Sequence, residues 1–356
     1  MVKFLSTRKL VVAGVASVMF AAPALAGQVL TFSDGSPNRG ARATASNWFA
    51  AELDKRTNGE LKIEFHWGGA LLKAKAATKG VGAGAADMGA IIGVYNPKLH
   101  PGYLLSDLPT DFSDPWVGTR AIYELATTNK SLIAEFSKLN LHYVTNFTTT
   151  EIQVICKGKA VKTIDDIKGI KVRGVGVYGK VFKDLGATPV RISAYKAYQG
   201  LDTGLINCSQ VYTYFVPAVK MQEVAKELTL LNWGALMGLT YAMNKDTWDA
   251  LSDDHKKIVT QLGSDFIDKY AQIITDGNTK ALADLKAGID GHKVNVHEFS
   301  ADDRAKLVAA AQPYVDSWKE KATAAGIDAD AFRNEYLGLL KKYDDEFKAK
   351  GYPWKR

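Results

Sequence analysis

Hydrophobic and polar residues follow two periods along the chain, one typical of strands and one typical of helices. Residues 28–33 and 61–67 alternate as half-buried strands do, and residues 87–92 form a short apolar strand. Between them, residues 40–57 carry an apolar helical face and residues 73–85 form a helix of small residues. Strands and helices in alternation predict an α/β unit with a parallel sheet.

A second α/β unit is predicted from about residue 141. Its predicted strands and helices are HYVTNFT (142–148), IQVICKG (152–158), a short helix from Thr163, 169–173, 176–185, 189–192, 195–203 and 205–208. Residues 239–243 are predicted to return as a strand to the first unit, and the chain is helical and amphipathic from Thr247 onward. We therefore predict lobe 1 from residues 27–150 plus about 239–285, lobe 2 from 151–238, and C-terminal helices over 286–356 that pack on both lobes. The length of the chain also favours two lobes over one core.

The first 26 residues have the pattern of a secretory signal peptide. A basic start with Lys3, Arg8 and Lys9 precedes the apolar run of residues 10–20, and small residues stand at 24 and 26. The run is too short for a transmembrane helix, which needs about 20 apolar residues. We expect cleavage after Ala26 and a periplasmic protein.

The charge of the chain does not indicate a nucleic-acid partner. The formal net charge is +7, and it falls to +4 without residues 1–26. The lysines are scattered rather than gathered in one patch, so the weakly positive field fits a small anion better than a nucleic acid.

The histidines do not form a catalytic or metal-binding motif. They stand at His66, His100, His142, His255, His292 and His297, without HxxxH or HExxH spacing. No GxSxG sequence is present. We therefore predict no metal site, no cofactor and no enzymatic activity.

Cys156 and Cys208 are the two cysteines of the sequence. In an oxidising periplasm they can pair as a disulfide. Two buried thiols that pack as small apolar side chains are the alternative.

Gly174, Gly176 and Gly179 form a GxGxxG sequence after a predicted strand and before a predicted helix. This is the context of a dinucleotide-binding loop, but no acidic residue ends a following strand as that motif requires. Arg173 directly precedes the glycines, and its guanidinium fits a carboxylate bidentately beside the free N–H groups of a helix start. The segment therefore favours an anion site, although an ion pair with a nearby acidic residue is the ordinary role of an arginine.

Aromatic residues follow the predicted strand that ends at Cys208. Tyr212, Tyr214 and Phe215 stand there, and Trp233 follows a further predicted strand, LTLLNW. Such side chains give a pocket apolar walls with polar hydroxyls, although core packing is an equal explanation.

The sequence as a whole resembles the DctP-type extracytoplasmic solute receptors of TRAP (tripartite ATP-independent periplasmic) transporters. The segments that carry the resemblance are 57–63, 68–72, 84–89, 165–173, 185–190, Tyr198, 204–207 and 223–229. The resemblance implies a clamshell of two α/β lobes with hinge strands and a long helix that spans both lobes. It also implies that Arg173 binds the ligand carboxylate, that the chain hands its ligand to TRAP membrane subunits, and that the chain itself catalyses nothing.

Departures from the family pattern concern the predicted ligand site. Thr150, Glu151 and Ile152 stand where many dicarboxylate-binding members have Gly-Phe-Arg, so a second common arginine is missing, while Gln153 is kept. Because a second carboxylate would then be buried without a partner, we expect a monocarboxylate with an aromatic or branched apolar body.

Of three further departures, two make the predicted lining more apolar and one adds a positive charge. Val211 replaces a ligand-binding Asn next to Tyr212, Trp233 replaces a frequent His, and Arg191 stands where Pro is frequent. A C4-dicarboxylate, a 2-oxo acid or a small sulfonate remains as an alternative, in particular if Arg191 points inward. Independently of Arg191, Glu151 is expected to accept a hydrogen bond from a ligand hydroxyl or amine.

We expect Arg173 to anchor the anion, Tyr212, Trp233 and Tyr95 to wall its body, and Gln153 and Asn38 to donate hydrogen bonds to it. A receptor of an ATP-driven importer and a periplasmic α/β enzyme are the alternatives. The protein is expected to be a monomer without a nucleic-acid partner.

Overall fold

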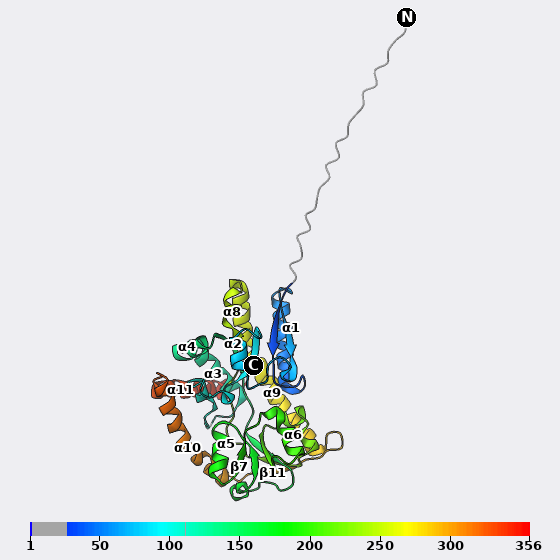
Figure 1. Ribbon diagram of the computed structural model, residues 1–356, viewed down its shortest axis with the longest axis vertical. Coiled ribbons are helices and arrows are strands. Elements are labelled where there is room, and N and C mark those ends of the chain that lie inside the picture. The colour runs from blue at the N-terminus through cyan, green and yellow to red at the C-terminus, as the bar shows by residue number, and fades with distance from the viewer. Residues whose placement is uncertain (2–26, 111) are drawn as a thin grey trace.

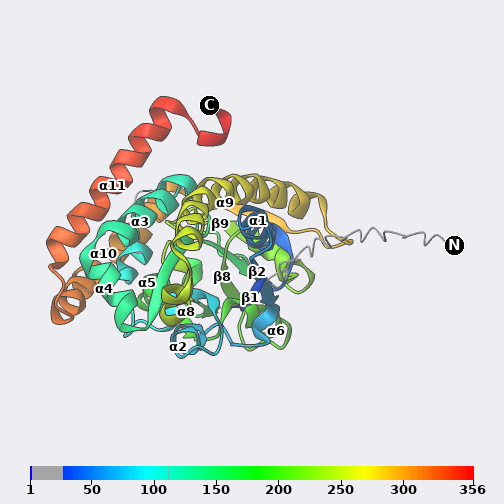
Figure 2. The same cartoon turned by 90° about the horizontal axis from the view of Figure 1, so that it is seen from above.

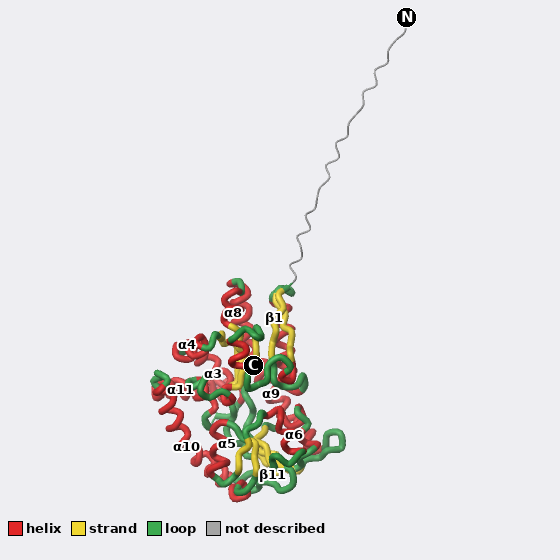
Figure 3. The backbone as a smooth tube through the Cα atoms, in the orientation of Figure 1, coloured by secondary structure: helices red, strands yellow, loops and turns green. Residues whose placement is uncertain are grey.

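The computed structural model describes Met1, residues 27–110 and residues 112–356, and its strands form two sheets (Figures 1 and 3). The predicted signal peptide lies, beyond Met1, outside the described residues. Figure 3 shows the strands in two groups, with β1 in the upper one and β11 in the lower one.

Lobe 1 is built on a five-stranded sheet of order β2-β1-β3-β10-β4. Its strands are β1 (Gln28–Ser33), β2 (Leu61–His66), β3 (Met88–Ile92), β4 (Leu141–Phe147) and β10 (Leu239–Asn244). Its helices are α1 (Gly40–Arg56), α2 (Ala77–Gly82), α3 (Pro115–Thr128), α4 (Lys130–Lys138) and α8 (Lys245–Ala250). β1 runs parallel to β2 and β3, whereas β10 is antiparallel to both of its neighbours.

Lobe 2 is built on a six-stranded sheet of order β11-β9-β5-β8-β6-β7. Its strands are β5 (Gln153–Cys156), β6 (Lys171–Arg173), β7 (Thr188–Val190), β8 (Cys208–Val211), β9 (Glu227–Leu230) and β11 (Asn295–Glu298). Its helices are α5 (Gly176–Asp184), α6 (Ala197–Asp202) and α7 (Phe215–Ala218).

The chain passes between the two sheets more than once. It leaves lobe 1 between β4 and β5 and returns between β9 and β10, and the predicted boundaries at 150/151 and 238/239 fall in these two connections. The 35-residue helix α9 (Asp253–Ala287) then packs on α1, α3 and β4 of lobe 1 and reaches α7 of lobe 2 (Figure 1).

Two long helices complete the chain. α10 (Ala301–Ala324) packs on α5 of lobe 2, and α11 (Ala329–Lys350) packs on α3 of lobe 1. Figure 2 shows α11 along the outside of α3, with the C-terminus at its far end. The two helices therefore link the outer faces of the lobes.

The structure corrects three details of the predicted elements. β4, which was predicted to open the second unit, is an edge strand of the lobe 1 sheet. β8 begins at Cys208, where the predicted strand ended, because Gly204 turns the chain with φ +73° and Leu205 is exposed. β11 lies inside the region predicted as helices only. It is an edge strand, NVHE, with one apolar residue and no buried residue, so it shows no apolar alternation.

Within the described residues, no helix is both long and apolar enough to span a membrane.

Candidate functional site

A small cavity of about 40 Å³ lies between the lobes. Its lining comes from the carboxyl ends of strands and from helix starts of both lobes, and consists of Arg42, Ile92, Val94, Tyr95, Phe147, Thr149, Arg173, Val175, Ala194, Tyr195, Tyr212, Tyr214, Phe215, Leu236 and Leu239. The lining contains six tyrosine or phenylalanine rings and two arginines, so the cavity is aromatic and carries two cationic groups. Such a mixture suits a small organic anion.

Arg173 is the last residue of β6 and is 1% exposed. Its Nε donates to the carbonyl of Ile192 at 3.3 Å, Nη1 donates to the carbonyl of Gln210 at 3.2 Å, and Nη2 donates to the Tyr95 hydroxyl at 3.4 Å. These acceptors are neutral, and among the described residues no carboxylate forms an ion pair with Arg173. A buried guanidinium without a counter-charge is costly, so the site favours an anion from outside the chain.

The hydrogen bonds of Arg173 leave donors for that anion. Each terminal nitrogen carries a second N–H beyond the one that is used within the protein. These two N–H groups match the two oxygens of a carboxylate.

The start of α5 lies beside Arg173 and adds to the positive potential. Val175 is the N-cap residue, lines the cavity and has no side chain that caps the helix. Its own N–H donates to Oε1 of Gln210 at 2.9 Å, which holds the turn after β6 in place. The unsatisfied N–H groups of a helix start favour negative charge nearby.

The walls are aromatic on the side of lobe 2. The rings of Tyr212 and Tyr214 are stacked with centroids 6.0 Å apart, and Phe215 lies 6.2 Å from Tyr212 at a steep angle. Burial raises the pKa of Tyr212 and of Tyr214 well above the ordinary value, even though Arg173 and Arg42 act in the opposite direction. Both hydroxyls are therefore neutral near pH 7 and serve as hydrogen-bonding groups.

A second arginine, Arg42 near the start of α1, lines the cavity from lobe 1. Its Nη2 donates to both oxygens of Asp34, at 2.8 and 2.7 Å, and Nη1 donates to the hydroxyl of Tyr195 in lobe 2. The guanidinium lies over Phe147 with 4.3 Å to the ring centroid. Burial lowers the pKa of Arg42, but Asp34 and the surrounding tyrosines together raise this pKa well above its ordinary value, so Arg42 stays protonated beside Asp34.

The start of α1 also touches lobe 2 directly. The exposed Arg39 donates from Nε to the carbonyl of Ala218 at the end of α7. A Cβ at Gly40 would lie 2.9 Å from that of Ala218, and Gly40 has φ +79°. The lobes are thus in close contact beside the cavity.

Of the residues expected to contact a ligand, Arg173, Tyr95 and Tyr212 line the cavity. Gln153 and Trp233 do not. The amide of Gln153 bonds to the backbone N–H and the side chain of Asn232, at 2.9 and 2.8 Å. Trp233 is 1% exposed and packs against Tyr178 at 4.8 Å, so both side chains serve the packing of lobe 2.

Asn38, Arg191 and Glu151 also lie outside the lining. Asn38 is exposed and accepts a hydrogen bond from Asn47, and Arg191 is exposed, with its carbonyl accepting from Lys75. Glu151 is half-buried, and burial together with the negative charge of Asp114 raises its pKa. In this structure none of these three side chains lines the cavity in which the ligand is expected to bind.

The sequence reasoning missed the Arg42–Asp34 pair, Tyr195 and Phe147. Asp34 directly follows a predicted strand, and Arg42 lies at the start of the next predicted helix. A carboxylate at the carboxyl end of a parallel strand was the available signal, because ligand sites lie at that edge of a sheet.

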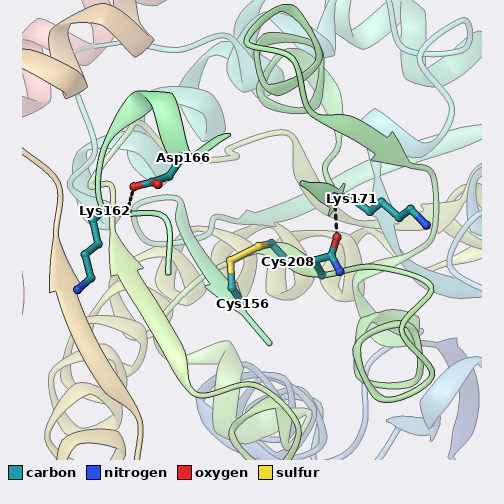
Figure 4. The surroundings of a disulfide bond; sticks show 6 residues. Cys156, Lys162, Asp166, Lys171 and Cys208 are labelled. Carbon is teal, nitrogen blue, oxygen red and sulfur yellow. Dashed lines mark hydrogen bonds between the residues drawn. A yellow bond between two sulfur atoms is a disulfide. The ribbon is translucent and has the colours of Figure 1, made fainter. Parts of the chain in front are cut away.

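The sulfurs of Cys156 and Cys208 lie 2.08 Å apart as a disulfide (Figure 4). The two residues face each other in the antiparallel pair β5–β8. The disulfide therefore links two central strands of the sheet that carries Tyr212 and Arg173.

Comparison with known proteins identifies the class. The family model described as bacterial extracellular solute-binding protein, family 7 (DctP) matches residues 32–321. The chain belongs to this family, which comprises periplasmic solute receptors rather than enzymes.

Individual relatives agree with that family. The C4-dicarboxylate-binding periplasmic protein DctP of Rhodobacter capsulatus is 27% identical over 286 residues, 79% of this chain and 83% of the relative. A TRAP periplasmic solute binding protein from Desulfovibrio salexigens is 25% identical, with TM-score 0.74 over 91% of this chain and 97% of the other. A TRAP solute binding protein from Rhodoferax ferrireducens, solved with copurified benzoate, is 21% identical, with TM-score 0.78 over 89% and 99%. The chain is thus similar to TRAP receptors for small organic acids, and those receptors differ in their ligands.

Proposed function

We propose that this receptor captures a small monocarboxylate with an aromatic or branched apolar body and delivers it to TRAP membrane subunits. The observation that carries the proposal is Arg173, a buried guanidinium whose acceptors within the described residues are all neutral and which lines an aromatic cavity.

The charges around the cavity support a ligand with one negative charge. Arg173 has no counter-ion among the described residues, whereas the charge of Arg42 is already balanced by Asp34. One net positive charge therefore faces the ligand. A second carboxylate would be buried without a net counter-charge, at a cost of several kcal/mol.

The lining of the cavity supports an apolar body, because tyrosine and phenylalanine rings contribute much of the wall. Flat rings pack well against such walls in stacked or edge-on contacts.

The proposal is tested by a thermal-shift screen of residues 27–356 against organic acids. A ligand at 100 times its Kd stabilises the folded state by about 2.7 kcal/mol, which raises the Tm measurably. We expect hits among aromatic or branched monocarboxylates. Hits restricted to C4-dicarboxylates would contradict the proposal.

The role of Arg173 is tested by calorimetric titration of an Arg173→Ala variant with the best ligand. Loss of one partner of a buried charge pair should weaken binding by about 2–5 kcal/mol. Arg191→Ala is the matched control, because Arg191 is exposed and lies outside the cavity lining. Equal affinity of the Arg173→Ala variant and the parent would exclude a carboxylate at this guanidinium.

A further inference from the structure

The two arginines that line the cavity have different surroundings. Arg173 has neutral acceptors, while Arg42 is bound by both oxygens of Asp34, which is 0% exposed. Asp34 is itself held by the backbone N–H and the hydroxyl of Ser36, each at 2.8 Å. The charge of Arg42 is therefore neutralised by a carboxylate that is fixed in place.

Arg42 nevertheless keeps an unused donor. Its Nε is buried and has no hydrogen-bond partner among the described residues. The neighbouring Tyr195 hydroxyl accepts from Nη1 of Arg42, so its own proton is free to donate. Arg42 and Tyr195 line the same cavity, one from each lobe.

An uncharged oxygen atom is the group that fits beside these donors. A buried donor without an acceptor carries a desolvation cost, which a ligand hydroxyl or carbonyl oxygen removes. A ligand carboxylate would instead meet the negative charge of Asp34.

We propose that the Arg42–Asp34 pair and Tyr195 form a second polar anchor of the cavity, which selects monocarboxylates that carry an uncharged hydroxyl or carbonyl oxygen on the body and rejects dicarboxylates. This inference rests on the proposed function, since it assumes that Arg173 binds the carboxylate. It deepens that function by naming the substituent and the residues that select it.

The inference is tested by calorimetric titration of the chain with benzoate, the monohydroxybenzoates and the benzenedicarboxylates. At least one monohydroxybenzoate should bind about 10- to 100-fold tighter than benzoate, because its oxygen satisfies buried donors. Every benzenedicarboxylate should bind at least about tenfold more weakly than that hydroxybenzoate.

An Asp34→Asn variant tests the charge balance. Removal of the carboxylate leaves Arg42 with a net charge, so the affinity for a benzenedicarboxylate relative to benzoate should rise at least about tenfold. Asp268→Asn is the matched control, because it removes the ion-pair partner of Arg120 among the described residues, and both residues lie outside the cavity lining. The control should leave the order of ligands unchanged.

The outcomes separate this inference from the function on which it rests. If no monocarboxylate binds the unmodified chain, the proposed function is wrong and the inference falls with it. If benzoate binds but hydroxybenzoates bind no tighter, or dicarboxylates bind equally well, the second anchor is wrong while the function stands. The ranking on the unmodified chain decides this even if Asp34→Asn fails to fold.

Discussion

Arg173 and Arg42 show which site residues a sequence can indicate. Arg173 ends a predicted strand before a glycine-rich turn, a local pattern that indicates an anion site. Arg42 and Asp34 are eight residues apart, and their contact depends on how α1 packs against the end of β1. The number of arginines was visible in the sequence, but which of them has a counter-ion was not.

Trp233 was predicted as a ligand wall from its aromatic character, and the structure places it buried in lobe 2, outside the cavity lining. We expect Trp233→Ala to lower the free energy of unfolding by about 3–5 kcal/mol through the cavity that it leaves. Urea denaturation measures this loss. The Kd of the folded variant should stay within about twofold of the parent, and a tenfold loss of affinity at unchanged stability would return Trp233 to the ligand site.

Asp107 predicts a pH effect on stability. Burial raises the pKa of this carboxyl to about 7, although the N–H of Gly238 donates to Oδ1 at 2.8 Å, and Oδ2 has no partner among the described residues. The folded state then holds a proton that the unfolded state has lost, so this group costs stability as the pH rises from about 4 to about 7. Asp107→Asn should remove that slope, and denaturation at a series of pH values checks it. Equal slopes in the parent and the variant would contradict the raised pKa.

At the scale of elements, the apolar pattern located the central strands and three of the edge strands, β2, β4 and β7, but not the edge strand β11. β3 and β10 consist entirely of buried residues and were predicted within a few positions. β11 has no buried residue and pairs with β9, so its sequence lacks the pattern. The sequence thus predicts strands that show an apolar pattern, and it misses β11, which contains a single apolar residue.

The disulfide links β5 and β8 and closes a segment of the chain with a sequence separation of 52. In the chain-entropy description such a link stabilises the folded state by about 4 kcal/mol. We expect the Cys156→Ser, Cys208→Ser double variant to lose stability of this order in urea, while the pairing of the strands still forms. The parent in a reducing agent is the control and should lose a similar amount. An unchanged denaturation midpoint in both would show that the link contributes nothing.

At the scale of the molecule, the contacts between the lobes predict how closure and binding are coupled. The lobes meet where α1 approaches Ala218, at a distance that leaves no room for a larger side chain at Gly40. A ligand that touches both lobes stabilises this closed arrangement. The binding affinity therefore contains the free energy of closure.

Ala218→Leu tests this coupling. The larger side chain should hold α1 away from α7, so that ligand affinity falls at least about tenfold while the Tm without ligand changes little. Small-angle scattering of the variant with ligand should show a larger radius of gyration than the parent with ligand. Val308→Leu at an exposed position of α10 is the control. Full affinity with a compact scattering profile in Ala218→Leu would exclude the coupling.

The position of β10 has a consequence for the order in which the protein is made. This strand lies between β3 and β4, yet it is supplied from residues 239–244, after the whole of the strand region from β5 to β9. During synthesis, which starts at the N-terminus, the strand that joins β3 to β4 in the sheet is missing until residues 239–244 have been made. Lobe 1 therefore cannot complete its five-stranded sheet until about two thirds of the chain, which includes the strands β5 to β9 of lobe 2, has been made.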